Sequence, residues 1–247
     1  MIKTLKGKVR ENITLTKDYR LLQIKTDSFF AFRPGQFINI KVTNTLSPFL
    51  RRPFSIFNYE DNVITVLYKV VGEGTGLLSE LKINDTVDLL GPLGNGFTLQ
   101  EGNNLLVAGG VGLGGIFYLT RFLKNYKLLV GVNTEKEKDA IRTILEEDAV
   151  VVSMEKDGTV VDYLNGIEVN ADFIYSCGPE IMMKNLYEKY MLVHNIPGEF
   201  SLEAHMACGI GVCMGCVKKI KTSENNIEYL RVCKDGPVFS ADAVVWE

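Results

Sequence analysis

The chain has 247 residues, with 27 lysine and arginine residues against 30 aspartate and glutamate residues, and a formal net charge of −3. This length allows two or three small domains, each with its own hydrophobic core. The balanced charge provides no basic field that would attract nucleic acid or an acidic membrane surface, so neither is a predicted partner.

The N-terminal part of the chain has the pattern of a series of short strands. Its first residues carry charges instead of the continuous apolar run of a secretory signal, so we expect a cytoplasmic protein. Strand-like segments follow at residues 9–16, 20–26, 36–42, 54–58, 63–71 and 86–91, with turn signals such as Arg33-Pro34-Gly35 between them. This spacing predicts a small antiparallel β-barrel, to which we assign residues 1–99.

Two segments of the predicted barrel carry groups that suit a flavin nucleotide. Residues 51–55, Arg-Arg-Pro-Phe-Ser, offer a guanidinium group that can bind pyrophosphate and a hydroxyl that can reach a flavin nitrogen. Taken alone, this pentapeptide also fits an ordinary barrel strand. Residues 72–76, Gly-Glu-Gly-Thr-Gly, precede a helix-like segment at 77–82 and predict a glycine-rich turn at a helix N-terminus, where phosphate binds. Together the two segments predict an FAD site.

From residue 104 the pattern changes to alternating strands and helices. Apolar strands at 105–110, 127–133, 149–154 and 173–178 are interleaved with helix-like segments, the longest of them at 180–195. The run at 105–119 contains five glycines and is shorter than the roughly 20 residues that span a bilayer. The alternation predicts a parallel sheet covered by helices, an α/β nucleotide-binding domain over residues 100–197.

Glycines follow the first strand of this predicted sheet. Gly110, Gly112 and Gly115 match the G-x-G-x-x-G pattern, but Asn133 stands where a dinucleotide fold usually has an acid, and Glu135 lies beyond the strand. The segment Cys177-Gly178-Pro179 follows another strand, which places it at the carboxyl edge of the sheet, where ligands bind in open α/β folds. A buried structural thiol is the alternative interpretation of Cys177.

Four of the five cysteines lie in the last forty residues. Cys208, Cys213 and Cys216 form a C-x4-C-x2-C motif, and Cys233 follows, which is plant-type [2Fe–2S] spacing with a short final gap. Interleaved glycines at 209, 211 and 215 allow the loop to curl. A four-cysteine zinc site and a group of inert buried thiols are the alternatives. Because zinc leaves the C-x4 arm without a role, we predict a [2Fe–2S] domain over residues 198–247.

Taken in chain order, these segments resemble the ferredoxin–NADP reductase superfamily with an added C-terminal [2Fe–2S] domain. Within it, residues 200–216 and 231–239 are most similar to the electron-transfer subunits of NAD-dependent dihydroorotate dehydrogenases. The resemblance implies FAD contacts at Arg52, Pro53, Phe54, Ser55, Leu67, Tyr68, Lys69, Gly74 and Thr75. It implies a cluster held by Cys208, Cys213, Cys216 and Cys233, and a nicotinamide site at Gly110, Gly112, Cys177 and Gly178.

Two positions depart from the pattern of this superfamily. Gly115 stands where proline is usual, which leaves the choice between NADH and NADPH open. His205 stands where arginine is common, and we assign it no role.

The resemblance also implies a route for electrons. Dihydroorotate would be oxidised at an FMN in a separate catalytic subunit, and the electrons would pass through the cluster and FAD to NAD+ in pyrimidine (UMP) biosynthesis. A hydride carries two electrons whereas the cluster accepts one, so the flavin must lie between them. A (β/α)8 barrel for the pyrimidine would need about 250 further residues. The resemblance further implies a heterotetramer with two copies of each subunit.

Three other functions remain open from the sequence. The chain could be the small subunit of an NADPH:ferredoxin oxidoreductase or the reductase subunit of a cytoplasmic hydrogenase, both of which are redox enzymes. It could also be a zinc-bearing interaction module with no enzymatic role. In the dihydroorotate route, no side chain of this chain needs to act as a general acid or base.

Overall fold

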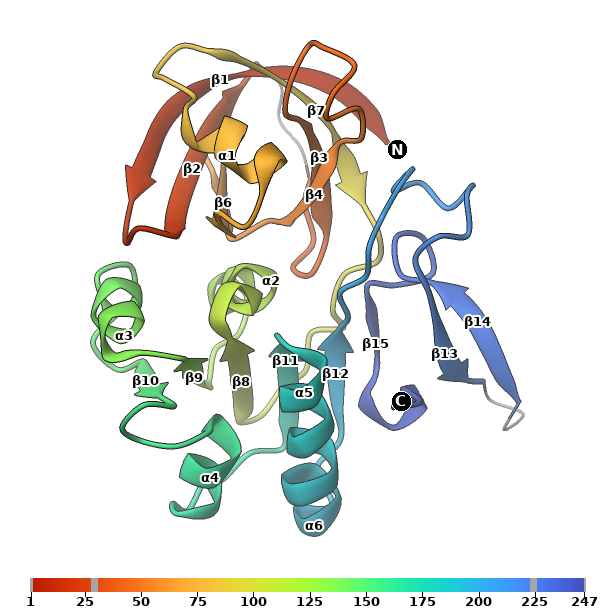
Figure 1. The fold of residues 1–247 in the computed structure, drawn as a ribbon. Helices are drawn as coiled ribbons and strands as arrows, with labels where there is room; N and C mark the ends of the chain where they lie inside the picture. The colour runs from red at the N-terminus through yellow and green to blue at the C-terminus, as the bar shows by residue number, and fades with distance from the viewer. Residues whose placement is uncertain (1, 28–30, 223–225, 247) are drawn as a thin grey trace.

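The computed structural model describes residues 2–27, 31–222 and 226–246. These residues form a seven-stranded sheet, a six-stranded sheet and a two-stranded hairpin. Figure 1 shows the N-terminal barrel lying above the second sheet, with the C-terminal segment beside both of them. No helix in these ranges is long and apolar enough to cross a membrane.

The first sheet is antiparallel throughout and has the strand order β4-β3-β7-β1-β2-β6-β5. Its strands are β1 (Lys3–Thr14), β2 (Tyr19–Thr26), β3 (Phe37–Lys41), β4 (Arg52–Ser55), β5 (Asn58–Glu60), β6 (Val63–Lys69) and β7 (Thr86–Leu93). The predicted barrel is confirmed. Strand β1 begins six residues before the predicted start at residue 9, because its mostly polar first half pairs with β7 while its second half pairs with β2.

The barrel closes around an aliphatic core, to which alternate residues of its strands contribute. Ile38 and Ile40 of β3 point inward and are fully buried, as are Ile24 and Val66 on the opposite strands. Helix α1 (Glu73–Ser79) lies over this core and buries Leu78 in it. The helix begins at Glu73, so the glycines of residues 72–76 form its first turn instead of a loop ahead of it.

The second sheet has the order β10-β9-β8-β11-β12-β15 and is parallel except for its last pair. Its strands are β8 (Asn104–Gly109), β9 (Tyr126–Val132), β10 (Val150–Ser153), β11 (Phe173–Cys177), β12 (Gly198–Ser201) and β15 (Val238–Ser240). Side chains alternate between its two faces, since Leu106 packs toward the barrel and Leu105 packs away from it. The predicted α/β fold is therefore confirmed.

Helices cover both faces of this sheet. The short turns η1 (Gly110–Gly112), α2 (Leu113–Ile116) and η2 (Phe117–Arg121) face the barrel, as does α3 (Glu135–Arg142). Helices α4 (Val160–Asn165) and α5 (Glu180–Leu186) cover the other face. The predicted helix over 180–195 forms, and continues from α5 as the π-helix η3 (Tyr187–Met191) and α6 (Leu192–His194).

Two helix starts depend on caps. The Thr134 hydroxyl accepts a hydrogen bond from the Glu137 N–H at 3.2 Å, so α3 starts three residues before the helix-like segment that begins at 138. Helix α4 was not predicted from the sequence, although Thr159 and Asp162 form a capping box at its start. Its six residues are too few to show a helical period.

The C-terminal segment leaves the second sheet after β12 and returns to it as β15, which pairs antiparallel with β12. Between these strands lie the cysteine loop and the hairpin of β13 (Val217–Lys221) and β14 (Ile227–Arg231). Cys216 and Cys233 share a hydrophobic cluster with Ile174 and Phe200 of the sheet. The predicted domain boundary before residue 198 thus falls just ahead of a strand of the nucleotide sheet, and as a domain boundary it stays a prediction.

Specific contacts fasten the three parts together. Asn95 at the end of the barrel donates its N–H to the Gly236 carbonyl at 2.7 Å and its side-chain amide to the Asp235 carbonyl at 3.0 Å. Phe57 stacks on Phe117 with ring centroids 4.2 Å apart. The linker after the barrel is held by Tyr175, whose hydroxyl donates to the Thr98 carbonyl at 2.7 Å and accepts the Gln100 N–H at 2.9 Å.

Replacing Tyr175 by phenylalanine should lower the free energy of unfolding by about 1–2 kcal/mol, because the change leaves two linker backbone groups without their partner. Urea denaturation followed by circular dichroism measures the change. Tyr229→Phe is the matched control, since that ring is 59% exposed, and it should leave the midpoint unchanged. Equal midpoints for all three proteins would show that the linker bonds do not stabilise the fold.

Candidate functional site

A pocket of about 390 Å³ lies between the barrel and the C-terminal segment. Its walls combine strands β4 and β6 of the barrel with residues 201–206, which begin at the last residue of β12 (Gly198–Ser201). Of the nine predicted FAD contacts, eight line this pocket: Arg52, Pro53, Phe54, Ser55, Leu67, Tyr68, Lys69 and Thr75. Their assignment to FAD stays a prediction, and the structure brings them into one place.

Gly74, the ninth predicted contact, supports the pocket from behind. A Cβ atom on Gly74 would lie 2.8 Å from Arg52 Nε, so the absence of a side chain there leaves room for the guanidinium group. Arg51 is engaged elsewhere, since its Nη2 lies 2.8 Å from the Asp88 carboxylate. Arg52 is therefore the arginine of the pair that faces the pocket. Its guanidinium group fits the pyrophosphate of a dinucleotide.

The start of α1 is ordered by Thr75. Its hydroxyl accepts the N–H groups of Val71 at 2.9 Å and Gly72 at 3.2 Å, and donates to the Gly72 carbonyl. The first turn of the helix is thus fixed beside the pocket, with the end that carries unpaired N–H groups near Arg52. A guanidinium group next to a helix N-terminus is a suitable environment for phosphate oxygens.

Aromatic and sulfur groups form the inner wall of the pocket. Phe54 and Tyr68 meet edge to face with ring centroids 5.9 Å apart, and burial raises the pKa of Tyr68 to about 12. Cys177 lines this pocket and is only 2% exposed. Burial raises the pKa of its thiol, which is therefore neutral.

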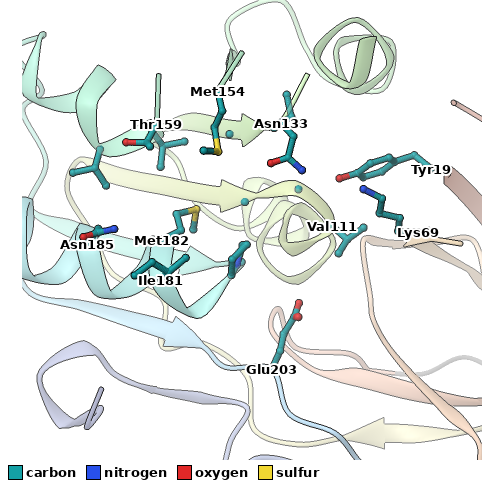
Figure 2. Close-up of a pocket in the computed structure, with 18 residues that line it drawn as sticks. Tyr19, Lys69, Val111, Asn133, Met154, Thr159, Ile181, Met182, Asn185 and Glu203 are labelled. Carbon is teal, nitrogen blue, oxygen red and sulfur yellow. The ribbon is translucent and has the colours of Figure 1, made fainter. Parts of the chain in front are cut away.

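A second cavity, of about 660 Å³, opens at the carboxyl ends of the parallel strands. Gly109, Val132 and Gly178 at the strand ends form its floor. In Figure 2, Asn133 and Met154 reach in from the ends of β9 and β10, while Tyr19 and Lys69 enter from the barrel. This is the edge at which nucleotides bind in open α/β folds.

The predicted nicotinamide residues are distributed over both cavities. Gly110 and Gly178 line the larger cavity. Gly112 lies beneath it, where an added Cβ atom would come 2.2 Å from the Cys177 carbonyl oxygen, so this position requires glycine for close packing. Cys177 instead lines the pocket of about 390 Å³, which we call the flavin pocket after the FAD contacts predicted there. The assignment of these four residues to a nicotinamide nucleotide stays a prediction.

The two cavities adjoin, because Lys69, Val111 and Glu203 line both of them. Lys69 Nζ lies 3.1 Å from Glu137 Oε1 and 5.1 Å from the centre of the Tyr19 ring. The carboxylate of Glu137 also accepts the Asn133 N–H at 2.9 Å. Lys69 was predicted only as an FAD contact, and the structure places it between the two sites.

Glu203 was missed by the sequence analysis. It follows β12 and lies in the region that lines both cavities (Figure 2). Its side chain is exposed to solvent there. Protein atoms around it displace part of its hydration, which raises the pKa of its carboxyl group. Nothing in the local sequence marks it, because its position depends on the pairing of β12 with β11. The adjacent His205 lines the flavin pocket, and no contact assigns it a role.

The four C-terminal cysteines are brought together, although 24 residues lie between the first and the last of them. Cys213 is exposed, while Cys216 and Cys233 are buried. The N–H groups of Ile210, Val212 and Cys213 all point at Cys208 Sγ, at 3.4–3.5 Å. The predicted turns are present at Gly209 and Gly211, which have positive φ, whereas Met214 takes the third such position in place of Gly215.

The sulfurs associate in two pairs. The Cys213 thiol is hydrogen bonded to Cys208, and the Cys216 thiol is hydrogen bonded to Cys233, whose N–H donates to Cys216 Sγ at 3.4 Å. Two pairs of thiolates are the arrangement that a two-iron cluster needs. Within the described ranges, no three histidine, cysteine or acidic side chains converge on a single metal ion. The linkage of Cys213 to Cys208 and of Cys233 to Cys216 fits the predicted two-iron cluster.

The loop also controls the charge of these thiols. Burial alone would raise the pKa of Cys208, but the N–H groups of Ile210, Cys213 and Val212 outweigh it and lower the pKa to about 6. Burial and the neighbouring Cys216 raise the pKa of Cys233 to about 12. The Cys208 thiol thus becomes anionic more readily than an ordinary cysteine, whereas the Cys233 thiol would release its proton only to the positive charge of a bound metal.

Comparisons with known proteins agree with this division. The family model for an oxidoreductase FAD-binding domain matches residues 6–97. The family model for the iron–sulfur cluster binding domain of dihydroorotate dehydrogenase B matches residues 203–245.

Curated relatives extend over most of the chain. The chain is 39% identical over 222 residues to the dihydroorotate dehydrogenase B (NAD(+)) electron transfer subunit of Caldanaerobacter subterraneus subsp. tengcongensis, which covers 86% of this chain and 87% of the relative. The subunit of the same name from Clostridium acetobutylicum is 37% identical over 246 residues and covers 96% of each chain.

Solved structures share the fold. An NADH-dependent reduced ferredoxin-NADP oxidoreductase superposes with a TM-score of 0.80 at 26% identity, covering 97% of this chain and 90% of that one. A ferredoxin reductase in carbazole 1,9a-dioxygenase superposes with a TM-score of 0.67 at 22% identity, covering 81% of this chain and 69% of that one. The latter likeness concerns the fold alone.

Replacing Gly74 by alanine should weaken FAD binding by about tenfold, because the new Cβ displaces the Arg52 guanidinium group. Gly76→Ala is the matched control in the same helix, since its Cβ would meet no atom within 4 Å. Flavin fluorescence during titration of the apoprotein measures both affinities. Equal affinities for the two variants would remove Arg52 from the flavin site.

Replacing Cys213 by serine should remove most of the iron and acid-labile sulfide, because one iron loses a thiolate ligand. Cys177→Ser serves as the control, since that thiol lies in the flavin pocket wall. Cys177→Ser should keep iron and acid-labile sulfide at wild-type levels. Iron and sulfide analysis of anaerobically purified protein gives the readout, and full iron content in Cys213→Ser would contradict the ligand assignment.

Proposed function

The chain belongs to the family of dihydroorotate dehydrogenase B electron transfer subunits, and from this membership we propose that it carries electrons from a catalytic partner subunit through a [2Fe–2S] cluster and FAD to NAD+. It is an oxidoreductase subunit with an FAD-binding domain and an iron–sulfur domain, and it functions in electron transfer in pyrimidine biosynthesis. The observation that carries the proposed route is the position of the flavin pocket, which shares lining residues with the larger cavity and whose wall at residues 201–206 lies just before Cys208 in the chain.

The flavin pocket lies between the other two sites. On one side it shares Lys69, Val111 and Glu203 with the larger cavity. On the other side its wall is residues 201–206, which lead directly into Cys208. A flavin in this pocket would be in reach of both a nicotinamide nucleotide and the cluster. This arrangement supports the order cluster, FAD, nucleotide.

Each part of the chain has a distinct task in this scheme. When bound, FAD supplies the conversion between one hydride and two single electrons. Arg52 and the first turn of α1 would hold its pyrophosphate, and residues 201–206 would cover one side of the bound flavin. Gly110 and Gly178 allow the nucleotide backbone to approach the carboxyl edge of the sheet. Lys69 supplies positive charge where the two dinucleotides meet.

The cluster loop is the surface that suits a partner subunit. Cys213 is exposed, and around it stand three apolar side chains, Ile210 at 40%, Val212 at 75% and Met214 at 51% exposure. Exposed apolar residues beside an electron donor mark a docking surface. We assign this surface to an FMN-containing catalytic subunit that oxidises dihydroorotate, in a cytoplasmic heterotetramer with two copies of each chain.

The alternative of a ferredoxin oxidoreductase subunit has its own support in the solved structure at 26% identity. The curated relatives at 37–39% identity favour the dihydroorotate route. The match of the cluster segment itself to the dihydroorotate dehydrogenase B model points the same way. We therefore retain dihydroorotate as the source of electrons.

Combining the holoprotein with the matching catalytic subunit should give dihydroorotate-dependent reduction of NAD+, measured as absorbance of NADH at 340 nm. Neither chain alone should support the reaction, because each lacks one end of the route. The Cys213→Ser chain should support little or none of it. Reduction of NAD+ by reduced ferredoxin without any response to dihydroorotate would contradict the proposal and favour the ferredoxin alternative.

A further inference from the structure

Asn39 occupies an unusual place in the wall between the barrel and the cluster loop. Its neighbours Ile38 and Ile40 point into the barrel core, so Asn39 and Phe37 point to the outer face of β3. That face is covered by the C-terminal segment, since Phe37 packs in the same cluster as Cys216 and Cys233. Asn39 is thus a polar side chain in a largely apolar interface.

The amide of Asn39 is deeply buried and incompletely bonded. The residue is 1% exposed, and its Oδ1 has no hydrogen-bond partner among the described residues. A buried amide without partners lowers stability, and an apolar residue of similar size would avoid that loss. The position of Asn39 therefore calls for a role other than packing.

The other end of the amide faces the cluster loop. An ideal Cβ on Gly209 would lie 2.1 Å from Asn39 Nδ2, so the amide lies against the backbone directly after Cys208. Gly209 has φ +69 at this point, and the next N–H groups turn toward Cys208 Sγ. On β4, the residue opposite Asn39 is Pro53 of the flavin segment. Asn39 thus stands between the flavin strand and the first cluster ligand.

We propose that Asn39 is a positioning residue for the iron–sulfur site, contributed by the barrel. Its amide N–H edge supports the Cys208–Gly209 backbone and directs the positive end of a dipole toward the cluster on the flavin side. The proposal rests on the proposed function, in that the four cysteines hold a [2Fe–2S] cluster. It adds a residue from outside the cysteine segment to the environment that sets the energy of the transferred electron.

The chemical consequence concerns the reduced cluster. Reduction adds negative charge to the cluster and its thiolates, and nearby N–H dipoles stabilise that charge. Removing the Asn39 amide should therefore lower the midpoint potential. Replacing Asn39 by the isosteric aspartate should lower the midpoint potential further, because its carboxylate repels the added electron.

The test uses the holoprotein and two variants, Asn39→Leu and the isosteric Asn39→Asp. The midpoint potential of the cluster is measured by redox titration with EPR detection of the reduced state. We expect Asn39→Leu to lower the equilibrium constant for one-electron reduction by about tenfold, which is about 59 mV for a one-electron couple. Asn39→Asp should show a larger shift in the same direction, with FAD content unchanged in both.

Ser176→Ala is the matched control. Ser176 is also fully buried, and its Oγ also lacks a hydrogen-bond partner among the described residues, but it lies in β11 of the nucleotide sheet. It should leave the potential and EPR spectrum of the cluster unchanged. A general effect of repacking a buried polar site would shift all three variants alike and would overturn the proposal.

The possible outcomes separate this inference from the proposed function. Wild-type potential and spectrum in both Asn39 variants, with the cluster intact, would overturn the role of Asn39 and leave the electron route standing. Loss of the cluster in Asn39→Leu but not in Ser176→Ala would support the positioning role. Wild-type protein without iron and sulfide would refute both proposals together.

Discussion

The pairing of β12 with β15 is the constraint on which the arrangement of the three sites depends. Phe200 lies opposite Phe239, and Ser201 lies opposite Val238, so the chain leaves the sheet and returns to it at one place. Residues 202–237, between these strands, therefore form a long connection whose two ends are held next to each other. Its first residues become a wall of the flavin pocket, and two of its cysteines, Cys216 and Cys233, enter the core shared with the sheet.

The pairing of β12 with its neighbours also explains which parts of the fold and site could be predicted from the sequence. Strands of the barrel, the glycine turn after β8 and the cysteine spacing are local patterns, and each was predicted from adjacent residues. The wall formed by residues 201–206 is not local, because it exists only when β12 adds to β11. Glu203 was missed for this reason. Cys177 was assigned to the nucleotide because it ends a strand, whereas its side chain turns to the barrel side and lines the flavin pocket.

Charge is concentrated where the cavities meet. Lys69 comes from the barrel, Glu137 from α3 and Glu203 from the segment after β12, so all three parts contribute to one small region. Because Glu137 binds both Lys69 and the Asn133 N–H, the end of β9 and the barrel are linked through a single carboxylate. A movement of the barrel relative to the second sheet would change the contacts of Glu137 with Lys69 and Asn133. Each cavity is therefore lined by residues from more than one part of the fold.

The connection between β12 and β15 also links the supply of iron for the cluster to the retention of FAD. Without iron, the segment would lose the metal–thiolate bonds to its four cysteines, while the adjoining wall of the flavin pocket would still be held by β12 and by the Leu202 N–H, which donates to the Pro237 carbonyl at 2.9 Å. Disorder in the loop would then spread to the neighbouring wall of the flavin pocket. In a cell short of iron, the chain would therefore lose FAD as well as the cluster, and both redox centres would be absent.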